Sequence, residues 1–267
     1  MLLIIFFLLS LLLLGFSSHL LFKNDKSQIS LTFFICFEMI ILGIIFISII
    51  SIILLELSSM RIYSILLISL ITSICFFLIT LSINKKFPKV LFHFKISKTI
   101  ILLIIILILA SFFRLPTWNW ICGGQDQGAY VNNGNYIART GKIIYRDTVF
   151  TLLKDKPNAL KYYQKNTNII RGFNGIYLGF VNSNIWYPHG FHLMPIWFAI
   201  SNLLLGVQNT TFPLYLFSIL SIILIFILAK DFTGNNYIGL LSALLMAVNP
   251  ILSFFSKFPV SILPGRF

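Results

Sequence analysis

Charged residues are scarce in this sequence, and acidic residues are the scarcest of all. Asp, Glu, Lys and Arg make up 10% of the 267 residues, and only seven residues are acidic. Soluble domains contain roughly 25% charged residues, and a water-facing surface built with so few would expose large apolar patches. The composition therefore excludes a soluble globular domain and indicates that lipid surrounds much of the chain.

Cysteine is also rare, with three in the whole chain. Cys36 and Cys75 fall inside apolar runs, and Cys122 alone lies in a polar segment. Three cysteines cannot form a disulfide framework, and no two of them have the spacing of a zinc-binding pair. We interpret all three as structural residues.

Long runs of Ile, Leu and Phe dominate the chain, and 58% of the residues are hydrophobic. A helix that is apolar on all sides is buried or spans a membrane, and about 20 apolar residues cross the hydrocarbon core. The first run lacks the basic segment and cleavage site of a signal peptide, so we interpret it as a retained anchor. The sequence predicts an all-α integral membrane protein with about seven transmembrane helices, at residues 1–22, 29–55, 62–84, 96–113, 191–207, 212–229 and 237–256.

Basic residues outnumber acidic ones, and the net charge is +13. In a soluble protein such an excess suggests a nucleic-acid partner. Here the basic residues lie between apolar runs, which fits contact with anionic lipid headgroups and the charge rule for membrane topology. We therefore expect membrane lipid as a partner and no nucleic acid.

The distribution of lysines predicts the orientation of the chain, because cytoplasmic loops of membrane proteins are enriched in Lys and Arg. Lysines such as Lys23 follow the first span, and residues 85–98 contain five lysines and no acid. If both loops are cytoplasmic, the N-terminus and residues 114–190 lie outside, and Lys257 and Arg266 lie inside. We expect a multi-pass protein of the plasma membrane.

Residues 114–190 form a long polar loop on the predicted extracytoplasmic side, and loops of this length are usually functional. Asp126, Asp147 and Asp155 are three of the seven acids in the chain. Residues 127–140 predict a surface helix that is ended by Gly141. The face expected to lie along the membrane interface consists of Ala129, Tyr130, Asn133, Ile137 and Ala138.

Asp126 is the acid with the most distinctive surroundings. Gly123, Gly124 and Gly128 surround it, and glycines allow tight turns and the close approach of a bulky ligand. One interpretation is that Asp126 caps the N-terminus of the predicted helix. The other is that its carboxylate, kept ionised by the helix dipole, takes part in chemistry. The two roles are compatible.

Two histidines lie at the start of the predicted fifth span. His189 and His192 are three residues apart, so a helix that already begins there would place both near one site. As metal ligands they need a third partner, and Asp126 is the most suitable one. We favour the alternative, in which both lie at the headgroup interface beside aromatic residues. The sequence predicts no definite cofactor, and a divalent metal is the open alternative.

Three segments carry a family resemblance. After an apolar helix with a basic flank comes Gly-Gly-Gln-Asp-Gln-Gly-Ala-Tyr130, then Tyr187-Pro-His-Gly-Phe-His-Leu-Met-Pro195, and then the segment that begins Ala247-Val-Asn-Pro-Ile-Leu-Ser. In this order they resemble the N-terminal half of the GT-C glycosyltransferases, which include protein O-mannosyltransferases and aminoarabinose transferases. The resemblance covers roughly 96–261, and residues 1–95 look like an added N-terminal extension of three transmembrane helices.

The resemblance implies an inverting transfer of a sugar from a polyprenyl-phosphate carrier to a lipid, glycan or protein acceptor outside the cytoplasm. In that family an acid early in the first outer loop is the catalytic carboxylate, and the matching residue here is Asp126. The motif residues around it are Gly124, Gln125, Gln127, Gly128 and Tyr130. The candidates for binding the donor phosphate are Arg139, Lys142, Arg146 and Arg171.

Two departures from the family pattern matter. Gln125 and Gln127 flank Asp126, where many relatives have two adjacent acids, and this argues against a bound metal. Relatives also continue through further membrane helices, whereas this chain stops at Phe267. We therefore expect 96–267 to be a truncated version of the family's N-terminal half, which leaves open whether this chain is active alone.

Two other function classes remain. A transporter or flippase would place an ionisable group inside the bilayer, and Glu38 is the only acid well inside a predicted span. A non-catalytic membrane scaffold would instead use residues 114–190 to dock a partner. Covalent sugar transfer, substrate flux across sealed vesicles, or neither would distinguish the three classes.

Overall fold

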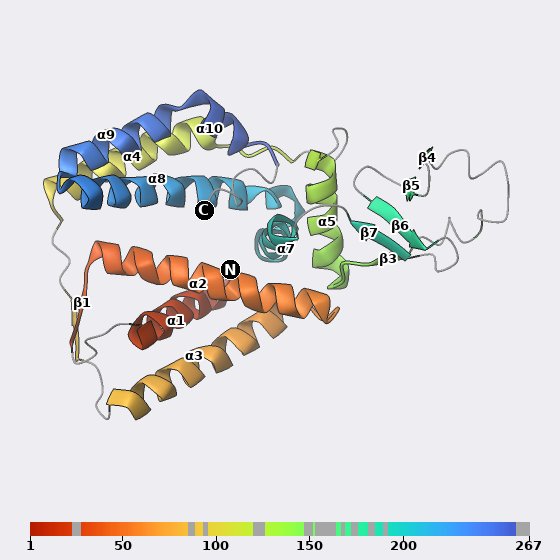
Figure 1. The fold of residues 1–267 in the computed structure, drawn as a ribbon, viewed down its shortest axis with the longest axis horizontal. Helices are drawn as coiled ribbons and strands as arrows, with labels where there is room; N and C mark the ends of the chain where they lie inside the picture. The colour runs from red at the N-terminus through yellow and green to blue at the C-terminus, as the bar shows by residue number, and fades with distance from the viewer. Residues whose placement is uncertain are drawn as a thin grey trace. The chain divides into compact units, whose positions relative to one another are not determined.

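A computed structural model of the chain describes residues 1–22, 28–84, 89–92, 96–119, 126–146, 152, 164–166, 169–171, 176–180, 185–188 and 192–259. The chain divides into two compact units, the N-terminal unit Met1–Lys98 and the C-terminal unit Thr99–Phe267. This division falls a few residues after position 95, where the sequence predicts the end of the N-terminal extension. Figure 1 shows the elements of both units.

The N-terminal unit contains three long apolar helices, α1 (Leu2–Phe22), α2 (Phe33–Glu56) and α3 (Ile62–Asn84). Glycines allow α1 and α2 to approach closely. A Cβ atom added at Gly15 would lie 1.8 Å from the Met39 carbonyl oxygen, and one added at Gly43 would lie 2.4 Å from that of Leu11. Small residues at helix contacts are typical of membrane proteins, since packing rather than the hydrophobic effect holds helices together in lipid.

Two short strands connect the loops of the N-terminal unit. Strand β1 (Gln28–Leu31) pairs in parallel with β2 (Lys89–Phe92). The predicted span 29–55 is therefore wrong at its start, because residues 29–31 are extended and α2 begins at Phe33. The pairing also places the two loops at one end of this unit, as the lysine distribution predicts, although it does not identify the side of the membrane.

Glu38, the acid predicted to lie inside a span, has a partner on another helix. Its Oε1 atom lies 3.1 Å from Nδ1 of His19, which is 7% exposed near the end of α1. Glu38 lies in the second turn of α2, near the end of the helix rather than at its middle. The pair links α1 to α2 close to one end of the unit.

Three helices of the C-terminal unit lie alongside one another: α4 (Lys98–Arg114), α8 (Phe212–Thr233) and α9 (Asn236–Val248). The end of α4 meets the start of α8 through a 2.9 Å contact between the Ser111 and Tyr215 hydroxyls. The start of α9 meets the end of α8, where a Cβ added at Gly239 would lie 2.9 Å from the Phe226 carbonyl oxygen. Helix α8 is therefore antiparallel to both neighbours.

Two further helices, α5 (Asp126–Thr140) and α7 (Leu193–Leu205), run across one end of this bundle (Figure 1). Helix α7 has 13 residues, which corresponds to about 20 Å at 1.5 Å per residue. The hydrocarbon core is about 30 Å thick. The prediction of a transmembrane helix at 191–207 is therefore not confirmed. A 3-10 turn, η2 (Val207–Asn209), leads from α7 into α8.

Lys257, near the end of the chain, lies at the same end of the C-terminal unit as Trp118. The Trp118 amide donates a 3.2 Å hydrogen bond to the Lys257 carbonyl oxygen, and the Lys257 ammonium lies 5.8 Å from the centre of the Trp118 ring. Lys257 thus lies beside the start of the polar loop. The sequence prediction that the two lie on opposite sides of the membrane does not fit this contact. Arg266 lies outside the described residues.

Part of the polar loop forms an antiparallel sheet in the order β3-β7-β6-β5-β4. Its central pairing joins β6 to β7, and Trp186 of β7, which is 2% exposed, pairs with Tyr145 of β3. The all-α prediction misses this sheet, although helices dominate the chain. The strands are β3 (Tyr145–Arg146), β4 (Gln164–Asn166), β5 (Ile169–Arg171), β6 (Ile176–Phe180) and β7 (Ile185–Pro188).

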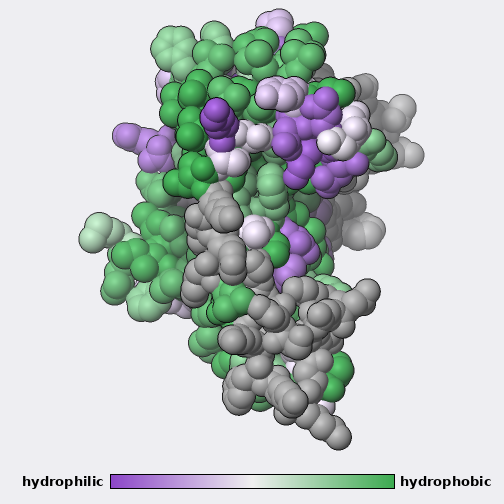
Figure 2. Space-filling model, turned by 90° about the vertical axis from the view of Figure 1, so that its left-hand side faces the viewer, coloured by the Kyte–Doolittle hydropathy of each residue, from purple (hydrophilic) through white to green (hydrophobic). Residues whose placement is uncertain are grey.

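Within the described residues, four helical segments are long and apolar enough to cross a membrane: Leu2–Phe22, Phe33–Glu56, Ile62–Ile83 and Val207–Thr233. Many large apolar side chains on these helices are exposed. On the face shown in Figure 2, hydrophobic residues cover most of the described part and hydrophilic residues gather in a few clusters. These features indicate a mainly helical, membrane-embedded protein.

Candidate functional site

Helix α5 begins at Asp126 and ends at Thr140, and Gly141 follows with φ of 70°. The sequence prediction of a helix over 127–140 with a terminating glycine is confirmed. A left-handed residue after a helix is most readily a glycine, which has no Cβ penalty there. Gly124 and Gln125 lie outside the described residues, and so do the side chains of Asp126 and Gln127. The cap and chemical roles of Asp126 both remain predictions.

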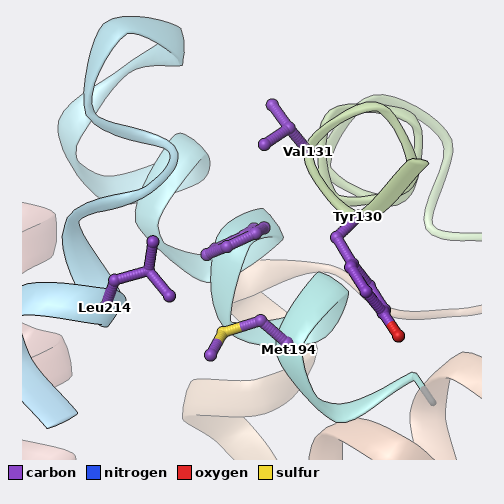
Figure 3. Close-up of a cluster of buried hydrophobic side chains, with 5 residues drawn as sticks. Tyr130, Val131, Met194 and Leu214 are labelled. Atoms are coloured by element: carbon purple, nitrogen blue, oxygen red, sulfur yellow. The ribbon is translucent and has the colours of Figure 1, made fainter. Parts of the chain in front are cut away.

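Helix α5 packs directly on α7. A Cβ added at Gly134 would lie only 2.5 Å from the Phe198 Cβ, so the two helices touch where this glycine lies. Around this contact, Figure 3 shows a buried apolar cluster from α5, α7 and α8. Its members are Tyr130, Val131, Met194, Phe198 and Leu214.

The buried surface of α5 is wider than the sequence predicts. Ala129, Tyr130 and Ile137 are buried as members of the predicted face, but Val131 is also only 1% exposed and Gly128 is buried. Protein covers these side chains, with α7 as the main neighbour. The predicted contact of this face with the membrane interface is replaced, for these residues, by contact with other helices.

Asparagine side chains join α5 to α7 and to the turn before α8. The Asn135 Oδ1 atom accepts hydrogen bonds from the Asn202 amide (2.7 Å) and from the Thr210 hydroxyl (3.0 Å). Thr210 is fully buried. Buried polar groups usually require partners, and this amide network supplies them between three separate segments. It therefore fixes the position of α5 relative to the bundle.

Tyr136 of α5 packs against Tyr145 of β3. The Tyr136 and Tyr145 rings are stacked with their centres 3.8 Å apart. Tyr145 donates a 2.5 Å hydrogen bond to Asn133 Oδ1, and Tyr136 donates one of 2.8 Å to the Ile144 carbonyl. Burial raises the pKa of the Tyr145 phenol far above its usual range, the Tyr136 phenol raises it further, and Arg139 opposes the shift. Tyr145 is a neutral donor at physiological pH.

A pocket of about 550 Å³ opens between these groups. It combines three primary amides, two phenol rings and one guanidinium, and none of the described residues that line it is acidic. The cluster Asn-Asn-Gly-Asn at 132–135 is the sequence signal that could have indicated it, because asparagines are unusual in a buried helix. The lining residues are Asn132, Asn135, Tyr136, Ala138, Arg139, Tyr145, Asn202 and Val207.

Arg139, one of the predicted phosphate-binding residues, lies far along α5 from Asp126. Arg139 is exposed and lines the pocket, while Lys142 and Arg146 are exposed outside it. Asp126 is the first residue of the 15-residue helix and Arg139 is the last but one, so about 20 Å of helix axis separates them. Arg171 lies on β5, and its side chain is outside the described residues. The pocket lies along α5 from Asn132 to Arg139, and its charged residue lies at the end of the helix opposite Asp126.

The predicted histidine pair is only partly described. His192 immediately precedes α7, and His189 lies outside the described residues. No group of three or more His, Cys, Asp and Glu side chains that could hold a metal is found among the described residues. The metal alternative of His189, His192 and Asp126 therefore stays a prediction.

Arg114 is a residue that the sequence did not indicate as part of a site. Its side chain is fully buried. Its Nε donates to the Ser218 hydroxyl (2.6 Å), its Nη1 to the Ala247 carbonyl (2.7 Å), and its Nη2 to the Met246 carbonyl (3.0 Å). One side chain thus links α4, α8 and the end of α9.

The carbonyls that Arg114 binds are freed by a helix break. Helix α9 ends at Val248, and Asn249, with extended backbone, caps α10 (Pro250–Phe255) by accepting a 3.0 Å hydrogen bond from the Leu252 amide. Proline has no N–H and cannot bond the carbonyl four residues earlier, which here belongs to Met246. The predicted span 237–256 is therefore two helices, joined at a break that the Arg114 guanidinium stabilises.

The start of the polar loop is held against the same end of the bundle. The buried Thr211 hydroxyl contacts both the Thr117 hydroxyl (3.1 Å) and Asn119 Oδ1 (3.0 Å), and the Asn119 amide donates to the Gln208 carbonyl. Trp118 packs edge-on against Phe254 with ring centres 6.1 Å apart. These contacts position the chain that leads toward Asp126.

No family model, curated protein or solved structure matches the chain. The geometry above is therefore the basis of the functional proposal, together with the sequence resemblance.

Proposed function

We propose that the chain is a membrane glycosyltransferase that moves a sugar from a polyprenyl-phosphate carrier to an acceptor on the extracytoplasmic face, with inversion. The observation that carries the proposal is the position of α5. A polar helix that begins with Asp126 is held rigidly, through Gly134 and Asn135, across the end of an apolar helical bundle. This is the boundary at which a lipid-borne sugar and a water-soluble or lipid acceptor can meet.

The proposed chemistry uses Asp126 as a general base. The acceptor hydroxyl oxygen forms a bond to the anomeric carbon on the face opposite the phosphate. The bond between that carbon and the phosphate oxygen breaks, and polyprenyl phosphate leaves. The hydroxyl proton passes to the Asp126 carboxylate. The start of a helix favours an ionised carboxylate there, as a base requires.

The leaving phosphate needs cations that neutralise its charge. Arg139 and Lys142 lie at the far end of α5 from Asp126, so the helix length argues against both as partners of a phosphate at the same anomeric carbon. Of the predicted candidates, Arg146 and Arg171 are left for this role. The proposed reaction needs no metal. In the alternative form of the proposal, His189 and His192 bind a divalent ion.

The arrangement of the C-terminal unit supports six spans rather than seven in the proposed topology. Helices α1 to α4 and α8 would cross, and α9 and α10 (236–255) would together make the sixth crossing. Helices α5 and α7 would lie on the extracytoplasmic side of the plasma membrane. The N-terminus would be outside, as the lysine distribution predicts. Glu38 would then lie near a membrane boundary and not at the midplane where transporters bind substrate, which favours the enzyme over a flippase.

Sugar transfer by membranes that contain the full chain tests the proposal, with a radiolabelled polyprenyl-phosphate sugar as donor. Asp126→Asn should lower the rate about 1,000-fold, as expected for loss of a general base. Asp147→Asn and Asp155→Asn are matched controls in the same loop and should retain the wild-type rate within about twofold. Transfer that persists in the Asp126→Asn variant would falsify the proposed role.

A further inference from the structure

The pocket between α5, α7 and β3 has an unusual chemical character for a membrane protein. Its amides and phenols are neutral, and Arg139 is the one charged residue among the described residues that line it. Its volume of about 550 Å³ falls within the roughly 300–1,000 Å³ of small-molecule sites. The absence of a carboxylate from the described lining leaves the Arg139 charge uncompensated there.

The hydrogen bonds within the pocket leave a donor and an acceptor for a ligand. Asn135 uses its Oδ1 atom to accept from Asn202 and Thr210, and its amide NH₂ has no partner among the described residues. Asn202 donates through Nδ2, and its Oδ1 has no partner in the same part of the chain. A primary amide can both donate and accept. The two groups match a hydroxyl, which also does both.

The stacked tyrosines add an apolar surface. The Tyr136 and Tyr145 hydroxyls are both engaged with protein acceptors, so the rings rather than the hydroxyls are presented to the pocket. An aromatic platform beside amide groups suits a ligand with both C–H surfaces and hydroxyls, as a sugar ring has. Arg139 lies within the same lining and suits a carboxylate or a phosphate, which guanidinium binds with two hydrogen bonds.

We propose that this pocket binds an anionic glycan, that is, a sugar ring that carries a phosphate or a carboxylate. The Asn135 and Asn202 amides bind ring hydroxyls, the tyrosine pair contacts the ring, and Arg139 binds the anionic group. Arg139, which binds the anionic group, lies about 20 Å along the helix axis from Asp126, so the anionic group is held away from the proposed catalytic carboxylate. This binding goes beyond the proposed transferase function and does not depend on it.

Binding to the full chain in lipid nanodiscs tests the proposal, with calorimetry as the readout. The probes are mannose 1-phosphate, glucuronate, mannose and inorganic phosphate. The first two should bind at least about tenfold more tightly than mannose, which is the usual worth of one hydrogen bond to a charged group. Inorganic phosphate should bind no more tightly than mannose, because it lacks the ring.

Variants distinguish a built site from general surface charge. Arg139→Gln should lower the affinity for both anionic sugars to that for mannose and leave the affinity for mannose unchanged. Lys142→Gln is the matched control, because Lys142 is exposed nearby but does not line the pocket, and it should leave all four probes unchanged. Asn202→Leu should lower the affinity for all three sugars. If Asn202→Leu does not fold, the exposed Arg139 still gives a decisive comparison.

Four results would overturn the proposal: no binding of either anionic sugar, phosphate binding as tightly as mannose 1-phosphate, an equal effect of Lys142→Gln and Arg139→Gln, or mannose binding as tightly as both anionic sugars. Preference between mannose 1-phosphate and glucuronate identifies the anionic group, and either preference supports the proposal. Asp126→Asn should leave binding intact. Loss of transfer and loss of binding are therefore separate failures.

Discussion

The Arg114 guanidinium lies 2.7 Å from the carbonyl oxygen of Ala247, two residues before Asn249, which follows the end of α9. Arg114 also binds Met246 and Ser218 and is fully buried. A buried cation whose recorded partners are neutral is stabilised by several good acceptors at once. The carbonyl end of α9 contributes further, because a helix C-terminus carries partial negative charge.

Replacing this arginine should destabilise the C-terminal unit. Arg114→Met leaves the Met246 and Ala247 carbonyls without donors in an apolar surrounding, and each such loss costs about 1–3 kcal/mol. We expect a total loss of about 3 kcal/mol, measured by unfolding in mixed micelles with increasing dodecyl sulfate. Arg61→Met removes an exposed arginine and should change stability by less than about 0.5 kcal/mol. Equal stability of the two variants would contradict the role of Arg114.

The energetic link between Arg114 and the helix break can be measured by a double-mutant cycle. Pro250→Ala restores an N–H that can donate to the Met246 carbonyl. Arg114→Met should therefore cost about 1 kcal/mol less in the Pro250→Ala background than in the wild type. Strictly additive effects would show that the guanidinium and the break act independently.

The sign of the stability change caused by Gly134→Ala tests the packing of α5 on α7. At an open helix position, a change from glycine to alanine stabilises by roughly 0.5–1 kcal/mol. Here the new Cβ would meet Phe198 at 2.5 Å and the Pro195 carbonyl oxygen at 3.1 Å, so Gly134→Ala should instead destabilise by about 1–3 kcal/mol. Thermal unfolding gives the answer. An increase in Tm would mean that α5 does not lie directly on α7.

Tyr145 should make stability depend on alkaline pH. Its pKa in the folded protein is raised by burial, above the value of about 10 for an exposed phenol. A raised pKa means that the folded state holds the proton more tightly than the unfolded state does. The stabilisation is complete below about pH 10 and is lost as the pH rises through the pKa of the folded protein.

The measurement for Tyr145 is unfolding free energy against pH, with phenolate absorbance followed in parallel. The wild type should lose stability above about pH 10 more steeply than Tyr145→Phe, which has no phenol to ionise at this position. Tyr145→Phe also loses the hydrogen bond to Asn133 and should be less stable than the wild type at neutral pH. Identical slopes for the two proteins would exclude Tyr145 as the titrating group.

Apolar runs and helix-terminating residues predict most of the helices. The runs at 1–22 and 62–84 match α1 and α3, and Gly141 correctly marks the end of α5. These features are local, because a run of lipid-facing residues or a left-handed glycine depends little on distant contacts. The same local information gives the acid at the start of α5 as a candidate.

Contacts between segments that are far apart in the chain could not be predicted from the sequence. The run 191–207 is apolar, and only the structure shows that it forms a 13-residue helix, α7, that packs against Gly134 of α5. The partners of Arg114 come from residues more than 100 positions away, which periodicity cannot reveal. The pocket likewise needs Asn202 and Tyr145 to be brought to one end of α5.

The most direct test of this account is the side of the membrane on which α5 and the end of the α9–α10 segment lie. Starting from a variant in which Cys36, Cys75 and Cys122 are serine, Lys142→Cys, Lys257→Cys and Lys98→Cys each introduce one cysteine for an impermeant maleimide. The account predicts that intact cells label the first two variants and that the Lys98→Cys variant is labelled only after permeabilisation. Labelling of the Lys142→Cys variant only after permeabilisation, or opposite results for Lys142→Cys and Lys257→Cys, would contradict it.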